Sequence, residues 1–245
     1  MNVNCTMLVH NRPRLTMQAL NSIGKHEGMN LTILAHNCDP ETSEMLEKWH
    51  EEQNEDGLEY HMQFNNEEMG TGDARNCVIQ SSEESFGRGQ YLYLSDNDVA
   101  FQVGWLQTLV NAYEKAAEHG FKVIGGYNHP YHLPIASVRV GYVGADEPQL
   151  NADFVVNEVY ALALQSMLMT WDVWDKYGPF QNTKPGAVCQ GEDCEFGNAI
   201  RADGGRLGVI SPSLLVNCGV TNSFGELIPG HDLVRKQAPS GVIVE

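Results

Sequence analysis

The first half of the chain alternates short apolar runs with longer segments that favour helices. The apolar runs have the composition and length of strands, and they lie at residues 3–9, 31–35, 58–64, 91–94 and 121–124. Those at 3–9, 31–35 and 91–94 are typical of buried strands. Pro13 suits the first turn of a helix after the first run, and residues 102–119 have the apolar face of a long amphipathic helix. Because parallel strands need crossover connections, this alternation predicts right-handed βαβ units and a parallel sheet in an α/β fold.

The apolar run at residues 91–94 is followed directly by charge, in Asp96, Asn97 and Asp98. In an open α/β sheet, ligands bind at the carboxyl ends of the strands. Two carboxylates one residue apart repel each other, and a hard divalent cation beside them would offset that repulsion. The segment therefore predicts a metal site. The alternative is an Asx-rich turn, because Asp and Asn also form turns locally.

A glycine-containing segment precedes the fourth apolar run. Gly70 and Gly72 stand before a predicted helix, where backbone N–H groups could approach phosphate, and Arg75 could pair with that phosphate. The alternative is that the two glycines only end a turn and that Arg75 is a surface residue.

A second acidic cluster, which begins at Glu192 and Asp193, opens a predicted helix near the end of the chain. Acidic side chains complement the positive N-terminal end of a helix dipole. Simple capping therefore explains the cluster as long as it is considered alone.

Composition limits the classes of partner. The chain of 245 residues carries 15 Lys and Arg against 32 Asp and Glu, a formal charge of -17 that opposes binding to nucleic acid or to an anionic membrane. Its six cysteines lack the paired spacing of a zinc site or of a secreted disulfide framework. With no apolar run of about 20 residues and no basic leader, we expect a cytoplasmic protein without a transmembrane segment.

Four blocks of this sequence, taken in order, resemble the GT-A glycosyltransferases, specifically the inverting nucleotide-sugar transferases of family 2. Each block alone is common, whereas the ordered set is specific. The blocks are His10-Asn11-Arg12-Pro13, the segment from Gly70 to Asn76, Asp96-Asn97-Asp98 with Gly104-Trp105-Leu106 after it, and Gly191-Glu192-Asp193.

The resemblance implies a GT-A-like three-layer sandwich with a mostly parallel central sheet, in one domain. Residues 1–125 would form a Rossmann-like half that binds the nucleotide sugar, and residues 126–220 would form the acceptor-binding and catalytic half. Residues 221–245 are rich in Gly, Pro and Ser, which is typical of a mobile tail. Such a tail could close over the diphosphate as a lid.

The implied reaction moves a sugar from a nucleoside-diphosphate sugar to the hydroxyl of an acceptor of unknown class. A UDP-sugar is the first candidate for the donor. Bound Mn²⁺ or Mg²⁺ would offset the charge that develops on the diphosphate, with Asp98 as its main protein ligand. Asp96 would reach the ribose or the metal. Asp193 would take the proton from the acceptor, and Glu192 would orient the acceptor.

The resemblance also implies a set of donor contacts. The residues expected to bind the nucleotide sugar are His10, Asn11, Arg12, Asn37, Asp39, Gly72, Arg75, Asp96, Asn97 and Arg235. Two positions depart from the family pattern. Asn37 or Asp39 would replace the usual acidic contact to the nucleobase, and His231 would replace the histidine that often completes the metal shell near the last strand.

Other classes fit the motifs less well. Nucleotidyltransferases have a Gly-rich loop directly after the first strand, where this chain has His10-Asn11-Arg12-Pro13. Haloacid-dehalogenase-type phosphatases have their acidic motif after the first strand, whereas here it follows the fourth. A nucleotide-sugar or carbohydrate binder without catalytic activity remains the alternative from another class, because fold and motif do not prove turnover.

Overall fold

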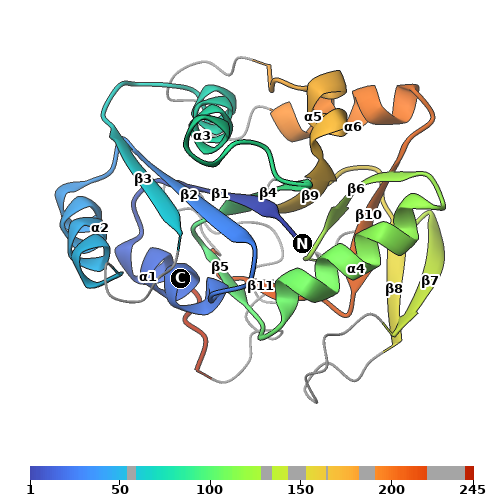
Figure 1. The fold of residues 1–245 in the computed structure, drawn as a ribbon, viewed down its shortest axis with the longest axis horizontal. Helices are drawn as coiled ribbons and strands as arrows, with labels where there is room; N and C mark the ends of the chain where they lie inside the picture. The colour runs from blue at the N-terminus through green and yellow to red at the C-terminus, as the bar shows by residue number, and fades with distance from the viewer. Residues whose placement is uncertain (54–58, 128–133, 143–152, 164, 182–190, 220–240) are drawn as a thin grey trace.

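A computed structural model gives the fold in Figure 1, and it describes residues 1–53, 59–127, 134–142, 153–163, 165–181, 191–219 and 241–245. Helices and strands alternate through the first half, as the sequence predicts. The elements in chain order are β1 (Val3–Val9), α1 (Pro13–Ile23), β2 (Met29–His36), α2 (Pro40–Gln53), β3 (Tyr60–Asn65), α3 (Thr71–Phe86), β4 (Tyr91–Asp96), β5 (Val99–Phe101), α4 (Trp105–Ala117), β6 (Phe121–Gly125), β7 (Ala136–Tyr142), β8 (Asp153–Glu158), β9 (Ser166–Thr170), α5 (Trp171–Tyr177), α6 (Glu192–Ala202), β10 (Arg206–Ser211) and β11 (Leu215–Asn217).

The central sheet has nine described strands in the order β3-β2-β1-β4-β9-β6-β10-β8-β7. The first four strands in this order are parallel to one another. β9 runs antiparallel between β4 and β6, and β8 runs antiparallel between β10 and β7. Because β10 is parallel to β6, only β9 and β8 oppose the other described strands. The prediction of a mostly parallel central sheet is confirmed.

Alternating side chains of β4 divide the core into two layers. Tyr93 points to the face that α1, α2 and α4 cover, where its ring centroid lies 4.7 Å from that of Trp105. Leu92 and Leu94 point to the opposite face and belong to the apolar cluster of Trp171 in α5. Figure 1 shows α3, α5 and α6 together above the sheet. The sheet is therefore covered by helices on both faces, as in a three-layer sandwich.

A short second sheet brings the end of the chain to the acidic motif. β5 begins directly after Asp98 and pairs antiparallel with β11. Beyond this pairing, the backbone N–H of Cys218 donates to the carbonyl oxygen of Asp98 at 2.7 Å. The sequence does not predict β5, and the helix predicted at residues 102–119 is shorter, at Trp105–Ala117. This pairing places the residues that follow β11 beside Asp98.

The last five residues, 241–245, pack against α1. The side-chain amide of Gln18 accepts from the N–H of Ile243 at 2.7 Å and donates to its carbonyl oxygen at 3.1 Å. Val242 and Ile243 also contact the small apolar cluster around Leu15 and Cys218. This part of the predicted mobile tail is therefore held in place by polar and apolar contacts.

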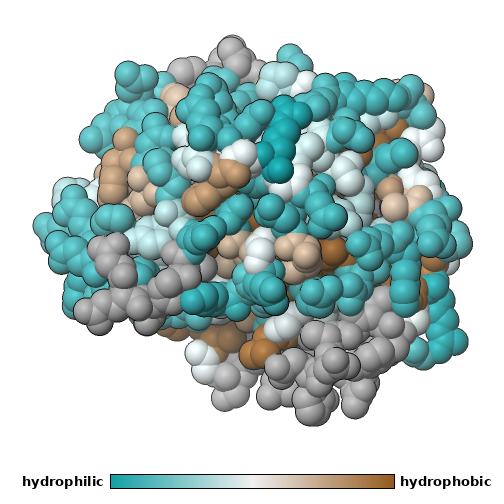
Figure 2. Space-filling model, viewed as in Figure 1, coloured by the Kyte–Doolittle hydropathy of each residue, from teal (hydrophilic) through white to brown (hydrophobic). Residues whose placement is uncertain are grey.

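Figure 2 shows a mostly hydrophilic face on which apolar residues form small, scattered patches. Among the described residues, no helix is both long and apolar enough to cross a membrane.

Candidate active site

Arg75 of α3 lies buried at the carboxyl end of β4, with 2% of its side chain exposed. Its Nη2 forms an ion pair with Oδ1 of Asp96, and its Nη1 donates to the carbonyl oxygen of Ser95 at 3.0 Å. Burial lowers the pKa of Arg75 to about 10, so the guanidinium is charged at neutral pH. Arg75 is therefore no surface residue, and its described contacts hold the last residues of β4.

The first turn of α6 lies within the electrostatic reach of the same guanidinium. The charges of Glu192, Asp98 and Asp193, in that order, oppose the fall in the pKa of Arg75. Glu192 is buried, with 4% exposed. Two acidic motifs that are far apart in the sequence, one after β4 and one opening α6, are thus brought together around Arg75.

Asp193 is half-buried in this first turn, and its Oδ1 accepts from the N–H of Cys194 at 2.7 Å. The helix N-cap itself is Gly191, which has φ of 82° and offers no side-chain cap. Asp193 therefore satisfies a backbone donor of the first turn, as the capping alternative expects. Its partial exposure also leaves the carboxylate open to a reactant.

Asp98 is paired with Arg12, the residue that precedes α1. Arg12 Nη1 donates to Asp98 Oδ2 at 2.6 Å, and the two side chains are 24% and 14% exposed. The other oxygen, Oδ1, is buried and has no hydrogen-bond partner among the described residues. Burial raises the pKa of Asp98, while the charges of Arg12 and Arg75 act in the opposite direction.

This carboxylate has the chemistry of a ligand for a hard divalent cation. A buried oxygen without a donor costs free energy unless a cation or a hydrogen bond satisfies it. Within the described part of the chain, no group of three His, Cys, Asp or Glu side chains is close enough to complete a metal shell. Asp98 thus fits one position of such a shell, and the other ligands would come from elsewhere.

The loops after β1 and β2 carry unusual backbone at three predicted donor contacts. Asn11, Arg12 and Asn37 have φ of 55°, 61° and 46°, and they are the only non-glycine residues with positive φ in the described ranges. Such conformations cost free energy and cluster at functional sites. Asn11 Oδ1 accepts from the N–H of Asp39 at 2.7 Å, and Asn97 Nδ2 donates to the carbonyl oxygen of Asn11 at 2.9 Å. The two loops and the acidic motif are therefore locked together.

The remaining residues of these loops have structural partners. Asp39 Oδ1 accepts from the N–H of Thr42 at 2.7 Å, so Asp39 caps α2. The Nδ1 atom of the exposed His10 lies 2.9 Å from the carbonyl oxygen of His36. His36 is buried, and burial lowers its pKa. The contact with the carbonyl oxygen of His36 fixes the position of His10 at the edge of the site. The sequence alone does not single out His36.

The chain matches no protein-family model and no curated protein. Several solved structures do match it. The mannosyltransferase PcManGT from Pyrobaculum calidifontis, in complex with GDP-Man and Mn²⁺, is 14% identical over 85% of this chain, with a TM-score of 0.56. GalNAc-T7 with UDP, GalNAc and Mn²⁺ is 16% identical over 86% of this chain, with a TM-score of 0.59. S. aureus TarS 1-349 is 15% identical over 88%, with a TM-score of 0.56.

The chain has the GT-A fold. This confirms the fold that the four sequence blocks imply. At such low identity the likeness concerns the fold, and this chain spans only 56%, 42% and 59% of those three chains.

Within the GT-A fold, close packing leaves no room for a side chain at two glycines, Gly72 and Gly219. A Cβ on Gly72 would lie 2.6 Å from the carbonyl oxygen of Gln181, so this glycine lets α3 approach the chain after α5. A Cβ on Gly219 would clash with Asp98 Oδ2 and lie 2.6 Å from Arg12 Nη1. The sequence gives no role to Gly219, although it follows the last strand of the predicted acceptor half. The pairing of β11 with β5 brings Gly219 to the site.

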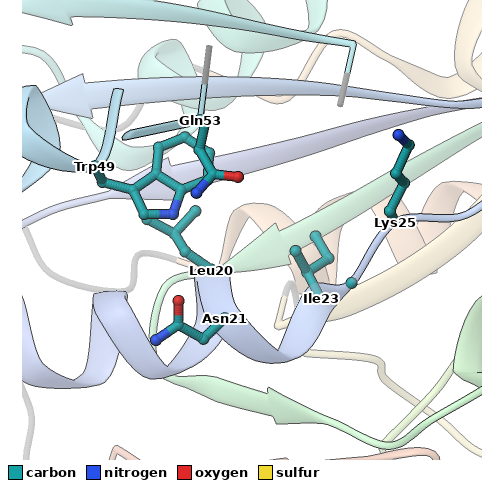
Figure 3. Close-up of a pocket in the computed structure, with 7 residues that line it drawn as sticks. Leu20, Asn21, Ile23, Lys25, Trp49 and Gln53 are labelled. Carbon is teal, nitrogen blue, oxygen red and sulfur yellow. The ribbon is translucent and has the colours of Figure 1, made fainter. Parts of the chain in front are cut away.

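Two of the predicted site residues cannot be placed. His231 and Arg235, predicted to bind the metal and the donor, lie outside the described residues. The pocket in Figure 3, with a volume of about 330 Å³, lies between α1 and α2 and is lined by Leu20, Asn21, Ile23, Gly24, Lys25, Trp49 and Gln53. This pocket shares no residue with the acidic site, so it does not mark the predicted donor position.

Proposed function

We propose that this chain is a glycosyltransferase that uses a divalent cation to move a sugar from a nucleoside-diphosphate sugar, with a UDP-sugar first, to an acceptor hydroxyl with inversion. One observation carries the proposal: Asp98 has a buried oxygen without a hydrogen-bond partner among the described residues, and the charges of Asp98 and Asp193 both act on the buried guanidinium of Arg75. A candidate ligand for a cation and a candidate base would thus share one countercharge near the carboxyl end of β4.

The donor half would be built on Asp98 and on the loops after β1 and β2. Asp98 would hold Mn²⁺ or Mg²⁺, which supplies a Lewis acid that offsets charge on the leaving diphosphate. The strained backbone at Asn11, Arg12 and Asn37 supports a binding role for these loops. Arg75 would keep Asp96 in place from behind, in contrast to the phosphate contact that the sequence suggests.

The acceptor half would use the first turn of α6. Asp193 would take the proton of the acceptor hydroxyl while the bond from the sugar to the diphosphate breaks. Attack from the side opposite the leaving group in a single step inverts the anomeric configuration. Glu192 is buried, and its charge would balance that of Arg75 beside its predicted contact with the acceptor.

The solved structures support the class of donor. PcManGT is in complex with GDP-Man and Mn²⁺, and GalNAc-T7 is with UDP, GalNAc and Mn²⁺. Both combine a nucleotide with a divalent cation on the GT-A fold, which is the combination proposed for this chain.

The experiment measures release of UDP and GDP from a panel of nucleotide sugars, with and without Mn²⁺, and thermal stabilisation by UDP with Mn²⁺. The parent protein is expected to show both effects, and Asp98→Ala is expected to lose the stabilisation that depends on Mn²⁺. Asp175→Ala removes a carboxylate that is 49% exposed and is the matched control. Undiminished Mn²⁺-dependent binding in Asp98→Ala would contradict the metal assignment. Saturable binding without any release of nucleotide would favour the binder over the enzyme.

A further inference from the structure

Asp98, the residue proposed to bind a metal ion, already forms an ion pair with the guanidinium of Arg12. Arg12 Nη1 donates to Asp98 Oδ2 at 2.6 Å, and only Oδ1 of the carboxylate has no hydrogen-bond partner among the described residues. Gly219 packs so closely on both side chains that a methyl group would clash with Asp98 and press on Arg12. A guanidinium and a divalent cation would therefore compete for one confined carboxylate.

The backbone holds Arg12 at this position. Asn97 Nδ2 donates to the carbonyl oxygen of Asn11 at 2.9 Å, and Thr16 Oγ1 donates to that of Arg12 at 2.9 Å. Arg12 itself has φ of 61°, a conformation that needs support from its surroundings. The side chain can reorient about its own torsions while its Cα remains fixed beside the site.

Arg12 is also the N-cap residue of α1. The first turn of α1 contains no acidic residue, and the side chain of Arg12 makes no capping hydrogen bond to the helix. The N-terminus of a helix favours phosphate, and a guanidinium binds phosphate oxygens through a planar fork. A diphosphate near this helix end would therefore offer Arg12 a second set of anionic partners.

We propose that Arg12 couples the binding of metal and of nucleoside diphosphate, by neutralising Asp98 when neither is bound and moving to the phosphates when both bind. This inference rests on the proposed function. The divalent cation alone competes with Arg12 for Asp98 and binds weakly. The diphosphate draws the guanidinium away from the carboxylate, so each ligand strengthens the binding of the other.

The test is a binding cycle by calorimetry for Mn²⁺ alone, UDP alone and the two together, at one pH and one ionic strength. In the parent protein, UDP is expected to tighten Mn²⁺ binding by about tenfold or more, within the usual range of coupling between sites. In Arg12→Gln, Mn²⁺ alone is expected to bind about tenfold tighter, and the tightening caused by UDP should fall by a similar factor.

Arg14→Gln is the matched control, because it also removes one positive charge near the start of α1. Arg14 is 68% exposed and pairs with Glu245, away from Asp98, so its variant should reproduce the parent binding cycle. If Arg12→Gln does not fold, as judged by circular dichroism, Arg12→Met takes its place. Methionine also removes the charge that pairs with Asp98 and keeps an unbranched side chain, so Mn²⁺ alone should again bind more tightly than in the parent protein.

The outcomes separate this inference from the proposed function. If the parent protein binds no Mn²⁺ even with UDP, the proposed function fails at its metal site. If the parent binds Mn²⁺ with UDP, but the Arg12 variant binds Mn²⁺ alone no more tightly than the parent, only the coupling role of Arg12 is overturned. An equal increase in Arg14→Gln would show a general effect of charge and would also overturn it.

Discussion

Removing the guanidinium of Arg75 is expected to cost about 3 kcal/mol of folding free energy. Arg75→Gln leaves Asp96 without its ion pair and leaves the charges of Asp98, Glu192 and Asp193 without their shared countercharge. Breaking a buried ion pair by deleting one partner costs roughly 3–5 kcal/mol. Because Asp96 is 29% exposed and keeps some contact with water, we expect the lower end of that range.

Thermal and urea denaturation measure this loss. For a chain of this size, about 3 kcal/mol corresponds to a fall in Tm of roughly 6–12 °C, since each 1 kcal/mol shifts Tm by about 2–4 °C. Arg88→Gln is the control. Arg88 pairs with Glu83 and Asp175 at 2.8 Å and 2.7 Å but is 40% exposed, so its loss should cost no more than about 1 kcal/mol.

A second substitution tests the electrostatic cause. Adding Asp96→Asn to Arg75→Gln removes the uncompensated carboxylate and should recover part of the lost stability, as a double-mutant cycle measures. The reasoning is refuted if Arg75→Gln is no less stable than Arg88→Gln. It is also refuted if the double variant recovers nothing.

Three further predictions concern the site and its support. Asp193→Asn should fold and bind UDP like the parent but transfer sugar about 10² to 10⁴-fold more slowly, as followed by UDP release, and near-normal turnover or a retained anomeric configuration in the parent's product would contradict its role as base. Gly219→Ala should weaken Mn²⁺-dependent stabilisation by UDP in thermal-shift assays, because its Cβ clashes with Asp98, and unchanged binding would separate this loop from the site. Gln18→Ala loses both hydrogen bonds to Ile243 and should speed amide exchange at that residue, whereas unchanged exchange would mean that apolar contacts alone hold the last residues.

The parallel half of the sheet could be predicted because its signals are local. The apolar runs of β1, β2 and β4 are buried on both faces, β3 is the half-exposed strand at the edge of the sheet, and right-handed crossovers leave little choice of topology. The short strand β5 was missed because its three residues are stabilised by β11, far along the chain. The directions of β8 and β9 depend on similar long-range pairings, which local composition does not encode.

Part of the candidate site could also be predicted, because its signals are local in the sequence. Asp96 and Asp98 follow directly from the end of a strand, and Asp193 follows from the opening of a helix. Gly219 could not be identified, because the long-range pairing of β11 with β5 is what brings it beside Asp98. The nearest sequence signal is that Asn217-Cys218-Gly219 stands where the resembled family often has the histidine of its metal shell.

The need of the acidic motif for countercharge could be predicted from the sequence, whereas the groups that supply it could not. Two neighbouring carboxylates require countercharge when they are partly buried, and this holds whatever provides the charge. In the described structure, Arg75 supplies it to Asp96 and Arg12 supplies it to Asp98. The two arginines differ in burial, since Arg75 is fully enclosed while Arg12 is 24% exposed at a helix N-terminus. The fixed countercharge at Asp96 would support the fold whatever the site binds. On the proposed coupling, Arg12 would compensate the charge of Asp98 when no ligand is bound and would release this carboxylate to a cation when the diphosphate binds.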